Sequence, residues 1–149
     1  GSIIRSGAAV GMRRLWLVGQ QSVSMHSPKV LRSSAGQWFR VPAAVATDLD
    51  ELVRTYAAQG VQVLAAAPKR DVEGGHSDTQ TLNVNYWDVD FRAPTLLLLG
   101  NEGNGLPRSV LETVPQVYIP CDPDVESLNV ATSCSLLLYE HARQNYKGV

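Results

Sequence analysis

The stretch Leu96-Leu97-Leu98-Leu99-Gly100-Asn101-Glu102-Gly103-Asn104-Gly105-Leu106-Pro107 decides the fold class of this 149-residue chain. Its four consecutive leucines, within a strand predicted over residues 95–99, show no alternation, which is typical of a central parallel strand covered on both faces. Three glycines follow within six positions. Glycine allows sharp turns and close approach of a ligand to the backbone. Because ligands bind beyond the carboxyl ends of strands in open parallel sheets, the stretch predicts a binding loop.

Strand and helix patterns alternate along the rest of the chain. Apolar runs predict further strands at residues 15–18, 38–41, 61–66 and 116–119. Helices are expected over residues 3–12, 28–34, 47–59 (with Thr47 as N-cap), 107–113 and 127–146. Residues 68–80 are polar and glycine-rich and predict a surface loop, whereas residues 86–91 fit neither pattern. The alternation predicts a single-domain α/β fold with a mostly parallel sheet.

The composition excludes several classes of protein. Hydrophobic residues make up 44% and charged residues 18% of the chain, which excludes a disordered polypeptide. The longest aliphatic run, Leu96–Leu99, is far shorter than the ~20 apolar residues of a membrane span. The first residues lack the pattern of a signal peptide. Cys121 and Cys134 lie in no metal-binding spacing, so we expect no metal centre and a reducing, cytoplasmic setting.

The formal net charge of −1 conceals an asymmetry between the two ends of the chain. Residues 1–70 contain nine Lys or Arg against three Asp or Glu, whereas residues 71–149 contain four against eleven. A basic half suggests a polyanionic partner such as a nucleic acid. Ordinary surface charge also segregates by chance, so the charge alone leaves both interpretations open.

The glycine-rich loop invites comparison with dinucleotide-binding loops. Its glycine order is GxxGxG rather than GxGxxG, and Glu102 would lie close to any bound pyrophosphate. Repulsion between the carboxylate and a phosphate argues against that use of the loop. The loop therefore suits a neutral or cationic ligand better, with a plain strand-to-helix turn as the structural alternative.

Two further segments carry residues that local structure alone does not require. Ile119-Pro120-Cys121-Asp122-Pro123-Asp124-Val125-Glu126-Ser127-Leu128-Asn129-Val130 leads from a strand through an acidic loop into a helix. Ser127 fits the N-cap of that helix. Asn129 would then lie in the first turn, where a cap has no use for its amide. Near the start of the chain, Arg5 stands among apolar positions of a predicted helix, where an arginine is usually only solvated.

Taken together, residues 96–107, 119–132 and 1–11 resemble the three signature motifs of the SpoU family, the TrmH-like branch of the SPOUT methyltransferases. They occur in the order and at the spacing of that family. The resemblance extends over essentially the whole chain, including residues 28–32 and Gly36, and implies one methyltransferase domain over residues 1–149. The first motif of the family begins with an asparagine two positions before the residue that matches Gly1. We therefore expect a catalytic domain that is clipped at its N-terminus.

The resemblance implies a fold, a cofactor and an assembly. The expected fold is an α/β sheet flanked by helices, with a deep C-terminal trefoil knot over about residues 96–129. The knot loops of the family hold S-adenosylmethionine, and its members are homodimers with the pocket at the subunit interface. The positions that match cofactor contacts are Ala66, Gly100, Glu102, Ile119 and Leu128.

The resemblance also implies methylation of a ribose 2′-hydroxyl in structured RNA, either tRNA or rRNA. Arg5 matches the catalytic arginine, which we expect to clamp a phosphate, because a guanidinium is hard to deprotonate; action as a base is the alternative. Ser127 and Asn129 match residues that orient the ribose and the loop, and Glu102 is expected to fix the loop rather than to transfer a proton. The basic half then supplies candidate RNA contacts at Arg13, Lys29, Arg32 and Arg40, together with Arg14, Lys69 and Arg70.

Two other functions are compatible with parts of the sequence. One is a knotted RNA-binding protein that has lost catalysis, which the presence of Arg5, Ser127 and Asn129 disfavours. The other is a Rossmann-like oxidoreductase with Asp122 as its ribose-binding acid, which the glycine order disfavours.

Overall fold

The computed structural model describes residues 1–19, 24–70 and 82–147. The chain divides into two compact units, residues 1–55 and residues 56–149, which we call the N-terminal unit and the C-terminal unit. The boundary between them falls inside helix α3 (Leu49–Ala58). Each unit has its own parallel strands and its own buried residues, and each is described by itself.

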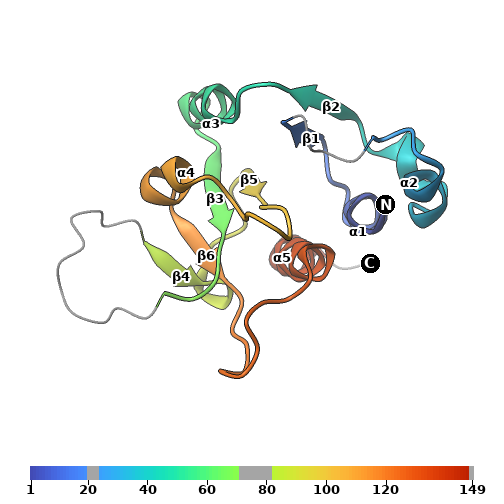
Figure 1. The fold of residues 1–149 in the computed structure, drawn as a ribbon. Coiled ribbons are helices and arrows are strands. Elements are labelled where there is room, and N and C mark those ends of the chain that lie inside the picture. The colour runs from blue at the N-terminus through green and yellow to red at the C-terminus, as the bar shows by residue number, and fades with distance from the viewer. Residues whose placement is uncertain (20–23, 71–81, 148–149) are drawn as a thin grey trace. The chain divides into compact units, whose positions relative to one another are not determined.

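The N-terminal unit contains a two-stranded parallel sheet and short helices (Figure 1). Its elements are α1 (Ser2–Ala9), β1 (Leu15–Val18), α2 (Pro28–Ser33), the 3-10 helix η1 (Gln37–Arg40) and β2 (Ala43–Ala46). Leu15 pairs with Ala43 at one end of the sheet, and Val18 pairs with Ala46 at the other. Ser27 caps α2, because its hydroxyl accepts the backbone N–H of Val30 at 3.3 Å. Helix α1 packs against η1 and buries Ile4.

The strand predicted at residues 38–41 is wrong. Gly36 has a left-handed backbone with φ of 77°, and the next residue, Gln37, donates its N–H to the carbonyl oxygen of Ser34 at 2.9 Å. This turn sends the chain into η1, and the strand comes later, as β2. The small side chains of β2 show no alternation, so the sequence does not predict this strand. The cap of α3 also differs from the prediction, because Asp48 rather than Thr47 accepts the N–H of Glu51 at 3.0 Å.

The C-terminal unit is built on a four-stranded sheet of order β4-β6-β3-β5 in which every pair is parallel (Figure 1). Its elements are β3 (Gln62–Ala66), β4 (Asn83–Asn85), the 3-10 helix η2 (Tyr86–Asp88), β5 (Thr95–Leu98), α4 (Arg108–Thr113), β6 (Gln116–Tyr118) and α5 (Val130–Asn145). The predicted α/β architecture with parallel strands flanked by helices is thus confirmed. Strand β4 was not predicted, and most of the loop expected at residues 68–80 lies outside the described residues.

The core of the C-terminal unit lies between the sheet and α5. Leu64 of β3, Val117 of β6, Phe91 and Leu137 of α5 pack together, and Phe91 and Leu137 are completely buried. Leu97 and Leu99 pack against this cluster from one side. Within the four-stranded sheet, however, β5 lies at the end of the strand order, so the central position predicted for it is wrong. Its leucines reflect contact with the core rather than a strand neighbour on each side.

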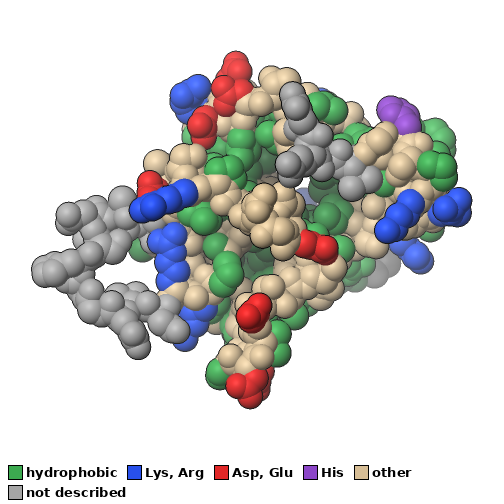
Figure 2. Space-filling model, viewed as in Figure 1, with side chains coloured by type: hydrophobic (Ala, Val, Ile, Leu, Met, Phe, Trp, Pro, Cys, Tyr) green, Lys and Arg blue, Asp and Glu red, His purple; other side chains and the backbone are tan. Residues whose placement is uncertain are grey.

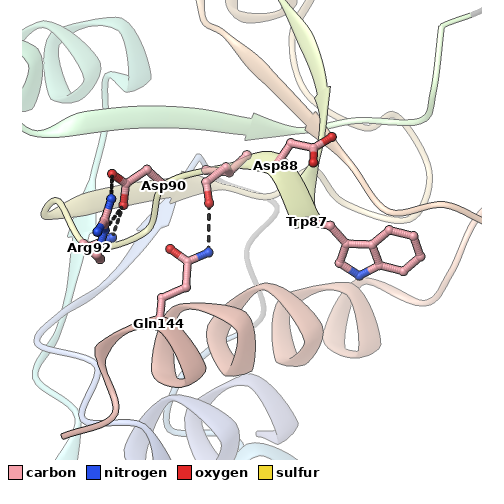
Figure 3. A pocket seen from close by; sticks show the side chains of 6 residues that line it. Trp87, Asp88, Asp90, Arg92 and Gln144 are labelled. Carbon is pink, nitrogen blue, oxygen red and sulfur yellow. Dashed lines mark hydrogen bonds and ion pairs between the residues drawn. The ribbon is translucent and has the colours of Figure 1, made fainter.

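The polypeptide between η2 and β5 is held on α5 by side chains instead of by a neighbouring strand. Gln144 of α5 donates its amide N–H to the carbonyl oxygen of Val89 at 2.8 Å (Figure 3). Its side-chain oxygen accepts the N–H of Phe91 at 2.7 Å. Asn145 adds a bond from its amide to the carbonyl oxygen of Phe91 at 2.9 Å. We call this set of contacts the Gln144 clamp. It fixes the buried Phe91 on the last helix.

The C-terminal unit contains the segment for which a knot is expected. The knot over residues 96–129 stays a prediction. Among the described residues, no helix combines the length and the apolar character that crossing a bilayer requires.

Candidate active site

A cavity of about 1030 Å³ lies in the C-terminal unit at the carboxyl ends of its four strands. The segments that follow β3, β4, β5 and β6 all contribute to its lining, as expected for a parallel sheet. The cavity brings together all the predicted cofactor positions and the three predicted catalytic positions of this unit, namely Ala66, Gly100, Glu102, Ile119, Ser127, Leu128 and Asn129.

The glycine-rich loop after β5 is organised by Asn101. Its side-chain oxygen accepts the backbone N–H groups of Gly103 at 3.1 Å and Asn104 at 2.7 Å. Its carbonyl oxygen accepts the N–H of Gly105 at 3.1 Å. The sequence predicts a binding site at this loop but indicates no role for Asn101. The local signal is an asparagine at the first position of a tight turn, where its side chain replaces a backbone acceptor.

Gly100 is required by the closure of this loop. A Cβ atom at Gly100 would lie 2.4 Å from the carbonyl carbon of Gly105 and 2.6 Å from the backbone nitrogen of Leu106. Those atoms belong to the backbone and have no rotamer through which to move away. The absence of a side chain at Gly100 lets the other end of the loop pack against it, and this shapes the wall of the cavity. Contact between this glycine and a ligand stays a prediction.

Asn129 is the N-cap of α5, so the expectation that the helix starts at Ser127 is wrong. The side-chain oxygen of Asn129 accepts the N–H groups of Ala131 at 2.8 Å and Thr132 at 3.4 Å. Its amide nitrogen donates to Oε1 of Glu102 at 2.9 Å. One side chain therefore starts the last helix and ties it to the glycine-rich loop. Ser127 lies before the cap, exposed and in the lining of the cavity.

The charged residues of the lining are mostly acidic. Among the described residues of the lining, Glu102, Asp122 and Glu126 are acidic and Lys69 is basic. Figure 2 shows acidic side chains on the projecting loop that Figure 1 draws between β6 and α5. Asp122 also stabilises that loop, because its carboxylate accepts the N–H of Asp124 at 3.0 Å and its carbonyl oxygen accepts that of Val125 at 2.9 Å. This excess of negative charge suits a cationic ligand and disfavours a pyrophosphate.

Lys69, Asn85 and Trp87 are among the lining residues for which the sequence predicts no cofactor contact. Lys69 had been assigned only to a possible RNA track, and Asn85 and Trp87 to no role at all. Asn85 accepts the N–H of Trp87 at 3.0 Å, which starts η2 at the edge of the cavity. The sequence does not indicate that Asn85 and Trp87 lie at the cavity, because β4 has only three residues. A strand that short gives no alternation from which its carboxyl end can be located.

Trp87 also borders a second, smaller hollow of about 360 Å³, which it shares with the Gln144 clamp (Figure 3). Asp90 and Arg92 form an ion pair there at 2.9 Å, and hydrogen bonding from Arg92 lowers the pKa of Asp90 to about 2. Both side chains are more than half exposed, so the pair contributes little to stability. We assign no catalytic role to this hollow.

Arg5 and the predicted RNA contacts belong to the N-terminal unit. Arg5 is exposed on α1. Arg13, Lys29, Arg32 and Arg40 are exposed on the same unit. Whether Arg5 acts at the cavity stays a prediction, since the two units are described separately.

Comparison with known proteins follows from this geometry. The fold and the cavity define a parallel α/β domain with a cavity lined by the loops beyond its strand ends. The sequence profile of the SpoU rRNA Methylase family matches residues 1–139, and the chain belongs to that family. The predicted resemblance is confirmed.

Several relatives and solved structures are similar over nearly the whole chain. A protein of Synechocystis described as an uncharacterized tRNA/rRNA methyltransferase is 42% identical over 98% of this chain and 49% of its own length. The 23S rRNA (uridine(2479)-2′-O)-methyltransferase of Streptomyces viridochromogenes is 34% identical over 99% of this chain and 49% of its own. The chain thus spans about half the length of these curated relatives.

The structure of the SpoU methyltransferase AviRb from Streptomyces viridochromogenes, in complex with AdoMet, superposes with a TM-score of 0.81 at 31% identity. The match covers 99% of this chain and 55% of AviRb. The AdoMet-bound rRNA methyltransferase of Sinorhizobium meliloti superposes with a TM-score of 0.80 at 30% identity. That match covers 98% of this chain and 51% of the Sinorhizobium protein.

Proposed function

We propose that residues 1–149 form the catalytic domain of an S-adenosylmethionine-dependent enzyme that methylates a ribose 2′-hydroxyl of tRNA or rRNA. The observation that carries the proposal is the cavity of the C-terminal unit, which gathers seven positions that the family resemblance had marked from separate stretches of sequence. Relatives named as 2′-O-methyltransferases and AdoMet complexes of related structures support it.

The residues of the cavity fit the chemistry of S-adenosylmethionine. Ala66, Ile119 and Leu128 give apolar surface for an adenosine, and the tight loop at Gly100 presents backbone groups. The acidic excess formed by Glu102, Asp122 and Glu126 favours a ligand with a sulfonium and an ammonium group. The bound cofactor supplies an activated methyl group, which leaves as the C–S bond breaks and the C–O bond to the ribose forms.

The protein's own part in this reaction is positioning. Asn129 and Glu102 hold the glycine-rich loop against the start of α5, which fixes the wall on which a cofactor rests. Ser127 lies exposed in the same lining, and we assign its hydroxyl the role of orienting the target ribose. Alignment of the 2′-oxygen with the methyl–sulfur bond supplies several kcal/mol of a barrier of this kind.

Arg5 has the role of holding the phosphate next to the reacting ribose. A guanidinium forms two parallel hydrogen bonds with a phosphate, a geometry that an ammonium cannot reproduce. The 2′-hydroxyl proton leaves to solvent or to a base as the methyl group arrives. The family resemblance further leads us to propose a homodimer in which the active site is completed at the subunit interface.

The decisive experiment measures tritium transfer from labelled cofactor to RNA under saturating cofactor, beside calorimetric cofactor binding. Arg5→Ala should lower the transfer rate about 100-fold, the scale of one lost charge-stabilising donor, while cofactor affinity changes less than twofold. Arg5→Lys should restore little of the rate. Arg54→Ala, which removes another arginine of the same unit, is the matched control and should transfer normally.

Near-normal transfer by Arg5→Ala would remove Arg5 from the active site. Intact RNA and cofactor binding by the unaltered chain without any single-turnover transfer would favour the inactive RNA-binding alternative. Binding of NAD in place of S-adenosylmethionine would favour the oxidoreductase.

A further inference from the structure

The first part of the N-terminal unit is free of acidic residues. Residues 1–47 contain six Lys or Arg and no Asp or Glu. The acidic residues of the unit are Asp48, Asp50 and Glu51, all at the start of α3. Figure 2 shows Lys and Arg side chains over the end of the molecule where Figure 1 draws α2. A surface of this composition attracts a polyanion and repels a second basic surface of the same kind.

An aromatic array lies within this basic region. The ring of Phe39 contacts that of Trp38 edge to face, with centroids 5.0 Å apart and an interplanar angle of 83°. The ring of His26 lies 5.7 Å from Trp38 on a tilted plane. Trp38 is half-buried and its indole nitrogen is buried, so it acts as a support. Phe39 is 82% exposed and is the ring that a ligand can reach.

Cations occur on the same short stretch of chain as the array. Arg40 follows Phe39 directly and reaches Gln37 at 3.4 Å across η1. Lys29 and Arg32 lie three residues apart on α2, and therefore on one helix face. Helix α1, which bears Arg5, packs against η1, which bears Phe39. The rings, the cations and the proposed catalytic arginine thus belong to adjoining elements of one unit.

We propose that Phe39, supported by Trp38 and flanked by Lys29, Arg32 and Arg40, is a stacking platform for an unpaired base of the RNA substrate. Single-stranded nucleic acid is bound by this combination of a stacking ring with cations that follow the backbone. The ring has no access to bases inside a duplex, so the platform selects RNA that presents an unstacked base. The inference rests on the proposed function for the identity of the polyanion, and it adds the structural state of the substrate.

The test measures binding of two RNA probes to the 149-residue chain without cofactor, by fluorescence anisotropy over a salt series. One probe is a short single strand, and the other is the same sequence fully paired. Phe39→Ala should weaken binding of the single strand about tenfold, leave the duplex within twofold and keep the salt slope unchanged. Phe39→Tyr should retain the affinity for the single strand. Phe39→Leu, which keeps apolar volume without a π face, should behave like alanine.

Two comparison variants separate stacking from charge and from exposure. Arg32→Ala should weaken both probes and lower the salt slope by about 1, because one phosphate contact is lost. Tyr146→Ala removes another exposed ring, 68% exposed and outside the basic region, and should change neither probe. Because Phe39 is exposed, none of its variants should alter the melting temperature by more than about a degree.

Several outcomes would overturn the platform. One is an equal loss of affinity for the two probes in Phe39→Ala, and another is normal affinity for the single strand in Phe39→Leu. A third is that the unaltered chain does not bind the single strand measurably. The fourth is loss of a dimer on sedimentation of Phe39→Ala, which would show that the ring lies at an interface between copies of the chain. None of these readouts uses methyl transfer. A chain that binds as expected but transfers no methyl group would therefore contradict the proposed reaction and leave the platform standing.

Discussion

The two units of the chain differ in the structural contacts that their proposed functional residues make. In the C-terminal unit, Gly100, Glu102 and Asn129 line the cavity and also hold its loops together. In the N-terminal unit, Arg5, Arg32 and Phe39 are exposed. A site built from residues with structural duties is rigid, but each of its substitutions mixes binding with folding. Glu102 and Asn129 are exposed as well, so the difference lies in these loop contacts and not in exposure.

The division also follows charge. The N-terminal unit carries seven Lys or Arg against three Asp or Glu, and the C-terminal unit six against eleven. The proposed RNA substrate is anionic, and the N-terminal unit assigned to it is basic. The proposed cofactor is cationic, and the C-terminal unit assigned to it is acidic. If this comparison is correct, substitutions in one unit should spare the ligand of the other.

The largest expected effect comes from Gly100→Val. The added side chain overlaps the backbone of Gly105 and Leu106, so the loop cannot close, and we expect a loss of about 3 kcal/mol in stability together with cofactor binding. Calorimetry with S-adenosylmethionine and thermal melting measure the two losses. Gly103→Ala is the matched control, because a Cβ there meets only the side-chain oxygen of Asn101, at 3.7 Å.

RNA binding by Gly100→Val sharpens the comparison. At temperatures where the variant is folded, its affinity for single-stranded RNA should equal that of the unaltered chain. A parallel loss of RNA and cofactor binding in the folded variant would show that the units do not divide the two ligands.

Gln144→Ala should destabilise the C-terminal unit without touching the large cavity. Removing the amide leaves the carbonyl oxygen of Val89 and the N–H of Phe91 without their partners, which costs about 2 kcal/mol. Denaturant unfolding measures the loss. Asn145→Ala, which removes one bond to this segment, should cost about half as much. Cofactor affinity should stay unchanged in both variants, and a drop would place the clamp within the binding machinery.

Much of this architecture was predictable because it depends on local pattern. The leucine run before Gly100, the proline at the start of α2 and the glycine after α3 each act on neighbouring backbone, so they located a strand and the ends of two helices. The position of the cavity followed from parallel topology, since carboxyl ends of parallel strands share one edge.

The rest depended on contacts between residues far apart in sequence. The capping role of Asn129 is local, but its bond to Glu102 spans 27 positions and appears in no spacing. In the sequence, Gln144 is an ordinary polar residue of the last helix. Its role depends on the segment around Phe91, which lies against the helix only in the folded chain. Strands β2 and β4 escaped prediction because small or few side chains give no alternation.

Asn129 offers a smaller effect that separates its two roles. Asn129→Ala loses the cap of α5, which costs about 1 kcal/mol, and also the bond to Glu102, so both stability and cofactor affinity should fall. Asn129→Asp keeps a capping oxygen at a helix N-terminus that favours negative charge. It places one carboxylate against another, so melting should be nearly normal while cofactor affinity falls.

The double variant Asn129→Asp with Glu102→Gln restores a donor opposite an acceptor and should regain affinity. Undiminished cofactor binding by Asn129→Asp would show that the link between Asn129 and Glu102 is dispensable for the site.

The smallest expected effect is confined to acid and concerns Glu140 of α5. Hydrogen bonds from Arg143 and then from Gln144, at 2.7 and 2.8 Å, lower the pKa of this carboxylate to about 2. A carboxylate whose pKa is lower in the folded than in the unfolded state stabilises the fold above the unfolded value, near 4.3. That stabilisation is lost as the pH falls from about 4.5 to about 2. Glu140→Gln should therefore flatten the pH dependence of unfolding in this window, measured by urea titration. Gln144, a residue of the clamp, also donates a hydrogen bond to this carboxylate, so the loss of stability in acid should be smaller in Gln144→Ala. An unchanged pH dependence in that variant would show that Gln144 does not contribute to the lowered pKa of Glu140.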